Sequence, residues 1–502
     1  MKKMFVILSG VIILIFLTVY IFLFTKFGNE RLSSVIENSV NKTGTIDFKF
    51  DTFVLTTDKL DVAATIDSTS LLSIRGDISP FKLKFNVDFN VDIKDLSKLE
   101  KFTAQKLNGP FKTSGNIGGN KDLLLIKGVA DDFGSSIKYD VVLKNFEPTN
   151  IDFAGQNIQI EQLLYTLNQP KYATGQIDLE GNITNANIDH LAGRIKTDIK
   201  NGTLNSKVLN DAFNLKLRST KQFSSKIDTT LKPRLIENKI DLFTSFANVF
   251  IQNASLNLND NSLNSDYKVV IEDLNNLYDL TEMKMLGKLE VDGVVTKNKD
   301  LTVLGNSQTL NGVIDFKLFN DDFSANVNSI DVLEMTKMLT YPSVFDSKAS
   351  ATVTYNLLTQ SGKATAKLLN GQFVKNKFSF LINTLAKFDL TKEIYKSVDI
   401  TSDIEKKIIQ SVVSMKSNST QIDVPQSRLD LESKTVNALV KLNIKGAKVD
   451  AKIKGEMNAP DISIDANDLL KQKAKDKLKK KLKEKLNTDD LDGLVNQLKK
   501  LF

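Results

Sequence analysis

The sequence has no cysteine and no tryptophan, and its only histidine is His190. Without cysteine, disulfides, thiolate metal sites and Cys–His catalysis are excluded. His190 lies between Asp189 and Leu191, where we expect an ordinary loop or strand residue. The motifs G-x-S-x-G, H-E-x-x-H and G-x-x-x-x-G-K-[ST] are missing as well. We therefore expect no enzyme activity, no metal and no cofactor, although a carboxylate pair for glycoside hydrolysis stays open as an alternative.

Glycine (24 residues) and proline (8 residues) are modest in number, and no low-complexity linker divides the chain. Gly118 and Gly119 lie in S-G-N-I-G-G-N-K, where we expect a turn rather than a phosphate cradle, because no helical pattern follows. The 30 phenylalanines greatly outnumber the 9 tyrosines. Because phenylalanine has no polar group, this aromatic content favours a dry surface over a polar binding site.

The net charge of +7 is concentrated at the two ends of the chain. Residues 468–502 carry eleven lysines against six acidic residues, and residues 1–31 carry four basic residues against one acidic residue. The body of the chain is therefore close to neutral, which argues against a nucleic-acid partner.

Residues 4–24 contain no charged side chain and follow Lys2 and Lys3. In a helix these residues would cover about 31 Å, enough to cross a bilayer core. Because no small-x-small cleavage site follows, we expect an uncleaved signal anchor, with a cleaved signal peptide as the alternative. Richness in Lys, Asn and Ile suggests an AT-rich bacterial genome. We therefore expect a single-pass protein of the bacterial inner membrane with the bulk of the chain in the periplasm.

Residues Phe81–Ile93 alternate apolar and polar side chains without interruption, which predicts one long strand with an apolar face and a polar face. Shorter alternating segments predict further strands at residues 46–51, 256–259, 314–318, 442–445, 449–454 and 462–465. Helices are expected at residues 28–42, 94–106 and 385–416. The predicted fold is mainly β with short helices: an N-terminal transmembrane helix, an elongated, twisted antiparallel β-groove and a C-terminal amphipathic helix.

Three segments with an apolar residue followed by an acid predict similar short helices at residues 160–167, 271–280 and 330–339. Strand-like segments follow them at residues 175–184, 287–296 and 347–356. Asn-Gly pairs then occur within residues 199–204, 309–314 and 368–373, where they predict tight turns or bulges. This self-similarity indicates a repeat array. The expected regions are an anchor (1–27), an N-terminal β-groove (28–155), a repeated groove (156–465) and a helical tail (466–502).

The tail is rich in lysine, with Leu or Ala at every fourth position from Leu470 to Leu486. One interpretation is an interfacial helix on an anionic membrane, and the other is a solvated helix that caps the sheet. The candidate membrane-surface residues are Lys473, Lys477, Lys480, Lys481, Lys485, Leu478 and Leu482.

Together, the apolar N-terminal segment, the G-x-Φ-x-Φ-x-G strands at 175–184 and 287–296 that follow I-[DE]-x-L helices, and the Lys/Leu tail resemble the AsmA-like family. This group of bacterial envelope proteins includes AsmA, TamB and YhdP. The resemblance implies a β-groove with an apolar floor, held at the inner membrane, that moves phospholipid toward the outer membrane or supports outer-membrane biogenesis. It brings no catalytic residues. A stack of about 25–30 strands would span roughly 120–145 Å, which falls short of the outer membrane, so we expect a second copy or an outer-membrane or periplasmic protein as a further partner.

The candidate lipid-groove residues come from the alternating segments, and they are Phe81, Leu83, Phe85, Val87, Phe89, Val91, Ile93, Ile177, Leu179, Leu289, Val291, Ile314 and Phe316. Three alternatives stay open. The same alternation describes a β-sandwich whose apolar faces form a filled core. The protein could be a non-catalytic scaffold that offers a sheet edge to outer-membrane proteins. It could also be an anchored module that binds peptidoglycan or a protein.

Overall fold

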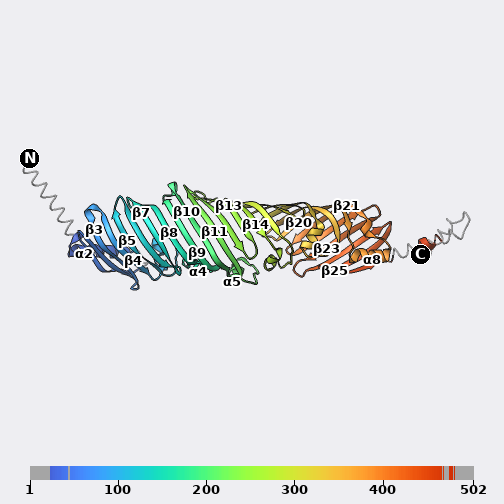
Figure 1. Ribbon diagram of the computed structural model, residues 1–502. Coiled ribbons are helices and arrows are strands. Elements are labelled where there is room, and N and C mark those ends of the chain that lie inside the picture. Colours follow the sequence, from blue (N-terminus) through green and yellow to red (C-terminus); the bar gives the residue numbers. More distant parts are fainter. Residues whose placement is uncertain are drawn as a thin grey trace, which may run out of the picture. The chain divides into compact units, whose positions relative to one another are not determined.

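The computed structural model describes residues 23–42, 46–103, 105–465, 467, 474–478 and 480. It is mainly β, with 26 strands assigned to one sheet and antiparallel pairing between neighbours in sequence, which confirms the predicted class. The chain divides into two compact units (Figure 1). Unit 1 comprises residues 1–269 and 279–281, and unit 2 comprises residues 270–278 and 282–502. The predicted boundary between residues 155 and 156 lies within a strand of unit 1.

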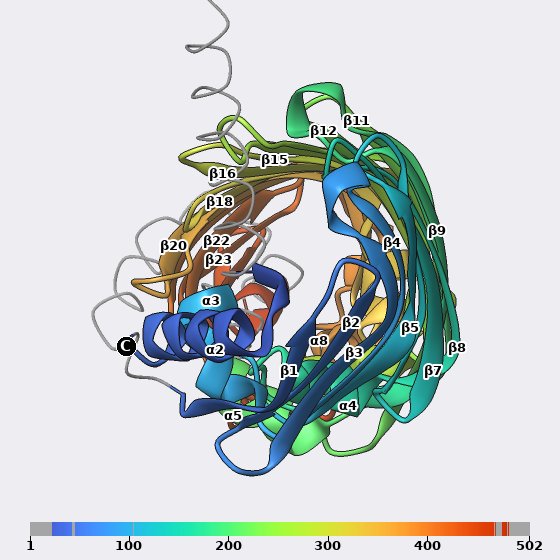
Figure 2. The ribbon, with the colours of Figure 1, turned by 90° about the vertical axis from the view of Figure 1, so that its left-hand side faces the viewer.

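The described part of unit 1 contains helix α2 followed by a run of antiparallel strands joined by hairpins or short helices. Its elements are α2 (Lys26–Asn41), β1 (Phe48–Leu55), β2 (Lys59–Ile66), β3 (Ser70–Ser79), η1 (Pro80–Lys82), β4 (Lys84–Ile93), η2 (Leu96–Leu99), α3 (Glu100–Thr103), β5 (Phe111–Asn120), β6 (Leu124–Asp132), β7 (Ser135–Lys144), β8 (Glu147–Gln159), α4 (Ile160–Thr166), β9 (Ala173–Asn185), η3 (Ile188–His190), β10 (Ala192–Leu204), α5 (Ser206–Phe213), β11 (Lys221–Lys232), β12 (Leu235–Thr244) and β13 (Asn248–Asn257). In Figure 2 the strands of this unit bend into an arc, with α2 beside β1.

Strand β14 (Leu263–Ile271) contains residues of both units, and unit 2 continues with the same alternation of strands and short helices. Its elements are η4 (Leu274–Leu277), α6 (Tyr278–Thr281, mostly in unit 1), β15 (Leu289–Lys297), β16 (Leu301–Thr309), β17 (Gly312–Phe319), β18 (Asp322–Asp331), α7 (Val332–Met338), β19 (Phe345–Asn356), β20 (Ser361–Phe373), α8 (Lys377–Ala386), η5 (Leu390–Lys392), β21 (Ile394–Glu405), β22 (Ile408–Lys416), β23 (Thr420–Asp430), β24 (Thr435–Ile444), β25 (Ala447–Glu456) and β26 (Asp461–Asp465).

The short helices of each unit lie at one rim of its strands because of the strand order. In unit 1, α3, α4 and α5 each connect an even-numbered strand to the next odd-numbered strand. In an antiparallel meander all such connections fall at the same edge, here called the helical rim. The helices α7 and α8 connect even to odd strands in unit 2 in the same way. The opposite edge, here called the hairpin rim, carries the connections from odd-numbered strands to the next even-numbered strands.

The two units repeat one arrangement with a period of roughly 175 residues. The hydrogen bond from Leu96 N to Gly109 O (2.8 Å) corresponds to the bond from Leu274 N to Gly287 O (2.8 Å). The bond from Gln159 N to Phe133 O (2.9 Å) likewise corresponds to that from Asp331 N to Leu310 O (2.8 Å). On this alignment η2 and α3 match η4 and α6, α4 matches α7, and α5 matches α8.

This alignment corrects the phase of the repeat that the sequence suggested. The helices predicted at 160–167 and 330–339 are indeed counterparts, α4 and α7. The segment 271–280 is instead the counterpart of residues 93–102, where I-E-D-L-N-N-L matches I-K-D-L-S-K-L. The Asn-Gly predictions are confirmed, since Asn201, Asn311 and Asn370 have φ of 50°, 57° and 50°.

The strand predicted over Phe81–Ile93 begins only at Lys84. Ser79 pairs with Lys84, so residues 80–83 form the turn between β3 and β4. Pro80 opens this turn, because its fixed φ and missing N–H do not suit a central strand. Leu83 has a φ of 46°. The prediction that Phe81 and Leu83 share the strand face of Phe85 is therefore wrong.

Two further local predictions are wrong. The helix expected at 385–416 is the hairpin of β21 and β22, and the helix there, α8, ends at Ala386. In the segment 385–416 apolar residues recur every four positions, which fits a helix. Val398 and Ile400 also alternate with polar neighbours, however, as a strand requires. Gly118 and Gly119 lie within β5 rather than in a turn. A Cβ at Gly119 would meet Leu123 O at 2.2 Å, so the close approach of the next strand requires glycine there.

The other predicted helices are placed as follows. The helix expected at 28–42 is confirmed as α2, and the segment 94–106 contains the short η2 and α3. The predicted anchor at residues 4–24 lies outside the described residues except for Leu23 and Phe24. Among the helices that the structure describes, none combines the length and the apolar character needed to cross a bilayer.

Candidate functional site

One face of the unit 1 sheet is a continuous apolar surface, here called the apolar face of unit 1. Cross-strand partners on an antiparallel sheet lie side by side on the same face. Val62 on β2 pairs with Ile74 on β3, and Ile74 pairs with Phe89 on β4. Farther along, Tyr139 on β7 pairs with Phe153 on β8. A second row runs through Val87, Ile117, Ile126, Val141, Ile151 and Ile183.

Glycines on neighbouring strands let aromatic rings lie along this face. Phe153 pairs with Gly181 on β9, where an added Cβ would lie 2.2 Å from the Phe153 ring. Tyr139 pairs with Gly128 on β6, where a Cβ would lie 2.5 Å from the Tyr139 ring. Each ring therefore lies over the backbone of an adjacent strand and covers polar peptide groups. The glycines consequently extend the apolar surface rather than interrupt it.

Most side chains of this face are only half-buried although they face their apolar neighbours. Phe85, Phe89, Ile126, Tyr139 and Phe153 are all of intermediate exposure. A filled sandwich core would bury such residues almost completely. The residues that are buried in unit 1 include Val87 and Ile93. Much of the apolar face of unit 1 therefore keeps apolar area accessible.

The structure brings together the predicted residues on β4 and β9. Phe85, Val87, Phe89, Val91 and Ile93 lie on the apolar face of unit 1, and so do Ile177 and Leu179. In unit 2 the predicted residues Leu289, Val291, Ile314 and Phe316 lie on the corresponding face of β15 and β17, and all four are half-buried. Phe81 and Leu83 lie outside both faces, in the exposed β3–β4 turn.

Sequence reasoning missed Tyr139 and Phe153. The signal was present, because I-K-Y-D-V at 137–141 and I-D-F at 151–153 both alternate apolar and polar residues. These runs are short, however, and their pairing with glycine-bearing strands is visible only in three dimensions.

Helix α8 covers the apolar face of unit 2 near the helical rim. Phe378, Ile382 and Ala386 of α8 join Phe345, Phe373, Tyr395, Val398, Val440 and Leu442 of the strands in one buried cluster. Ile382 and Tyr395 are fully buried. Here the protein fills its own interior, as the sandwich alternative expected for the whole chain.

The counterpart of α8 in unit 1 does not fill the interior of its unit in this way. Helix α5 has no buried residue, and its Phe213 is exposed. Aligned on the capping residues Asn205 and Asn376, α5 has Lys207 and Asp211 where α8 has Phe378 and Ile382. Charged side chains at these two positions cannot enter an apolar interior without a large desolvation cost. The two units therefore differ in how much apolar surface they leave accessible.

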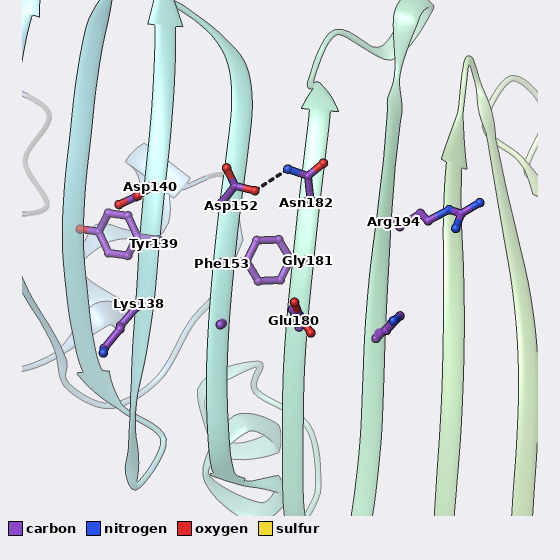
Figure 3. A pocket seen from close by; sticks show the side chains of 11 residues that line it. Lys138, Tyr139, Asp140, Asp152, Phe153, Glu180, Gly181, Asn182 and Arg194 are labelled. Atoms are coloured by element: carbon purple, nitrogen blue, oxygen red, sulfur yellow. Dashed lines mark hydrogen bonds between the residues drawn. The ribbon is translucent and has the colours of Figure 1, made fainter.

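The polar face of unit 1 contains a shallow hollow of about 430 Å³ over β7 to β10 (Figure 3). Lys138, Asp140, Glu180 and Arg194 line it, and Asn182 donates a hydrogen bond to Asp152. The hollow exists because Ala154 is small compared with its cross-strand neighbours Lys138 and Glu180. Its charged groups are solvent-exposed and of both signs, which is typical of a solvated sheet face.

The resolved pKa shifts of unit 1 have structural causes. The hydrogen bond from Lys200 (2.6 Å) and the backbone N–H of Asn157 lower the pKa of Asp178 on the polar face. Burial raises the pKa of Asp132, whose Oδ1 accepts a hydrogen bond from Phe133 N. Among the described residues, no group of three or more His, Asp or Glu is placed to hold a metal ion. His190 is exposed in η3.

The predicted membrane-surface residues of the tail are described only in part. Lys477, Leu478 and Lys480 are helical and exposed. Lys473, Lys481, Leu482 and Lys485 lie outside the described residues. Comparison with protein-family models, with curated proteins and with solved structures finds no match for this chain.

Proposed function

We propose that the protein binds phospholipid acyl chains on the apolar face of unit 1 and carries lipid between the inner and outer membranes of a bacterial envelope. The observation that carries the proposal is a ladder of apolar side chains from β2 to β9, most of which the protein itself leaves half-exposed. The resemblance to the AsmA-like family and the apolar segment at residues 4–24 agree with this role.

The physical basis is the similarity of this face to a bilayer interior. Each CH₂ group that leaves water gains about 0.8 kcal/mol. An acyl chain lying on Phe89, Tyr139 and Phe153 would lose little compared with its place among other lipid tails. Because similar residues recur from strand to strand, neighbouring positions would have similar energies, and sliding would meet no deep trap. The headgroup would stay in water at the edge of the sheet.

The experiment compares two double variants of the same strand. Phe85→Asp with Phe89→Asp places two charges on the apolar face of β4. Asn86→Asp with Asn90→Asp places the same charges on its polar face, where both asparagines are exposed. Full-length protein is extracted in mild detergent, and co-purifying phospholipid is measured by mass spectrometry.

We expect the first variant to lose its lipid and the second to keep it. Equal lipid content in both variants would contradict the proposal. Absence of stoichiometric lipid from the unaltered protein would also contradict it, and would favour an anchored module that binds a protein or peptidoglycan.

A further inference from the structure

Three hairpin turns at the hairpin rim of unit 1 expose large apolar side chains. Phe81, in the β3–β4 turn, is 67% exposed. Leu123, in the β5–β6 turn, is 46% exposed, and Phe146, in the β7–β8 turn, is 51% exposed. Turn positions usually hold Gly, Pro, Asn, Asp or Ser, for reasons of backbone geometry and hydration. An exposed phenylalanine or leucine in three successive turns therefore needs an explanation.

The three turns are neighbours in space. Lys84 at the start of β4 pairs with Asn120 at the end of β5, and Leu124 on β6 pairs with Leu143 on β7. Successive turns are thus two strands apart, a spacing of about 10 Å. Phe81, Leu123 and Phe146 consequently form one row, here called the apolar turn row.

Lysines accompany the apolar turn row. Lys82 and Lys121 lie in the first two turns, and Lys144 ends the strand that enters the third. All three side chains are exposed, and with Lys84 at the start of β4 they outnumber the two exposed acids beside these turns, Asp122 and Glu147. Apolar side chains mixed with lysines suit the boundary between lipid headgroups and acyl chains on an anionic bilayer.

The row is also connected to the point where the chain would leave a membrane. The ring of Phe81 lies 5.5 Å from the ring of Phe24, with the ring planes tilted by 56°. Phe24 is the last residue of the uncharged apolar segment 4–24. If this segment lies in a bilayer, Phe81 is at the surface of that bilayer.

The counterparts of these turns on the internal alignment show that the fold does not require apolar residues there. The β13–β14 turn, at the end of unit 1, contains Asp260, and in unit 2 the β15–β16 turn contains Asp300 and the β17–β18 turn contains Asp321. All three aspartates are exposed. Leu357 and Leu358 in the β19–β20 turn are exposed too, but the adjacent turns carry Asp321 and Lys406, so they form no row.

We propose that the apolar turn row of unit 1 inserts into the headgroup region of the anionic bilayer from which the chain emerges. The row would hold the hairpin rim of unit 1 against the membrane, beside the apolar face. The inference rests on membrane attachment through residues 4–24, and it does not depend on whether the apolar face carries lipid.

The absence of cysteine makes a direct test simple. Single cysteines replace Leu123, Phe146, Asp300 or Asp321 in the full chain, and each carries an environment-sensitive fluorophore. The protein is reconstituted into vesicles of phosphatidylethanolamine and phosphatidylglycerol with nitroxide-labelled lipid. We expect strong quenching and a blue shift at positions 123 and 146, and weak quenching at positions 300 and 321. Equal quenching at all four positions would overturn the proposal.

A second measurement separates insertion from lipid carriage. With a fluorophore at Lys121→Cys, the triple variant Phe81→Asp, Leu123→Asp and Phe146→Asp should lose quenching but keep its co-purifying phospholipid. The control Leu358→Asp removes a 79% exposed leucine from a unit 2 turn and should change neither readout. The Phe85→Asp, Phe89→Asp variant should lose lipid but keep quenching. Unchanged quenching in the triple variant would refute the insertion of the row and leave the lipid-binding proposal intact.

Discussion

Asn29 of α2 and Leu55 of β1 are joined by two hydrogen bonds. Leu55 N donates to Asn29 Oδ1 at 2.6 Å, and Asn29 Nδ2 donates to Leu55 O at 2.9 Å. Asn41 makes the same pair of bonds with Phe48 at the other end of β1 (2.7 and 2.9 Å). Between them, Glu37 accepts a hydrogen bond from Phe50 N at 2.7 Å. Polar side chains of α2 thus satisfy the backbone edge that another strand would otherwise occupy.

The first prediction concerns this edge. Asn29→Ala should lower the local free energy of opening of β1 by about 1 kcal/mol, because it leaves the partly buried N–H and C=O of Leu55 without their side-chain partner. Hydrogen exchange of the Leu55 amide, followed by mass spectrometry, measures the effect. Asn38→Ala, at an exposed position of the same helix, should leave that exchange rate unchanged. Equal exchange in the two variants would show that α2 does not protect the edge.

The position of α2 illustrates what the sequence could predict. The helix itself was predictable, because its apolar spacing is a local property. Its contact with β1 was not, because Asn29, Glu37 and Asn41 read as surface residues until their distance to a strand edge is known. The strands were predictable for the same reason, because the alternation of side chains along a strand is a local property, whereas the pairing of strands is not. The match of residues 93–102 with 271–280 depends on equivalent tertiary hydrogen bonds, so the helix pattern alone misassigned it.

The candidate site was predictable to a similar extent. The alternation on β4 and β9 placed Phe85 and Leu179 on one face, and the structure agrees. The difference between α5 and α8 could not be seen, because Lys207 and Phe378 become comparable only after the units are aligned. Phe81 was assigned to the strand because the alternation of apolar and polar residues begins there. Pro80 lies one position earlier, so it does not interrupt that alternation.

The second prediction compares the two counterpart helices. Ile382→Ala in α8 should lower the free energy of unfolding by about 2–5 kcal/mol, because the side chain is fully buried in the cluster of unit 2. Leu209 in α5 is only half-buried, so Leu209→Ala should lower the free energy of unfolding by about 1 kcal/mol or less. Hydrogen exchange of each helix and its neighbouring strands provides both values. A loss of stability for Leu209→Ala as large as that for Ile382→Ala would mean that α5 also packs into the interior of its unit.

The third prediction is a pH dependence of unit 2. Tyr395 is fully buried, its hydroxyl lies 2.7 Å from Thr420 Oγ1, and burial raises its pKa to about 12. The unfolded chain has a tyrosine pKa of about 10. Because the folded state then holds the proton more tightly, this contribution to stability is complete below pH 10 and is lost between pH 10 and pH 12. The loss should be about 1.4 kcal/mol at pH 11.

Tyr395→Phe should remove this dependence without leaving Thr420 unpaired, because Ser417 Oγ lies 2.8 Å from the Thr420 hydroxyl. Urea unfolding of unit 2, followed by hydrogen exchange at pH 9 and pH 11, provides the comparison. The stability difference between the unaltered protein and the variant should shrink at the higher pH. The half-exposed Tyr355, replaced by phenylalanine, serves as the control. A constant difference between pH 9 and pH 11 would exclude Tyr395 as the titrating group.

The fourth prediction asks which part of the apolar surface lipid can reach. The photoreactive residue benzoylphenylalanine is placed at Phe153, on the apolar face of unit 1, or at Phe378, in the buried cluster under α8. It should crosslink to phospholipid at position 153, because that ring is half-exposed and surrounded by accessible apolar side chains. At position 378 the protein itself fills the space, so crosslinks should form within the chain. Ala154, the next residue on β8, points to the polar face and should give neither product. Lipid adducts at 378 as frequent as at 153 would mean that α8 leaves the sheet in the membrane-bound protein. Lipid could then reach the apolar faces of both units.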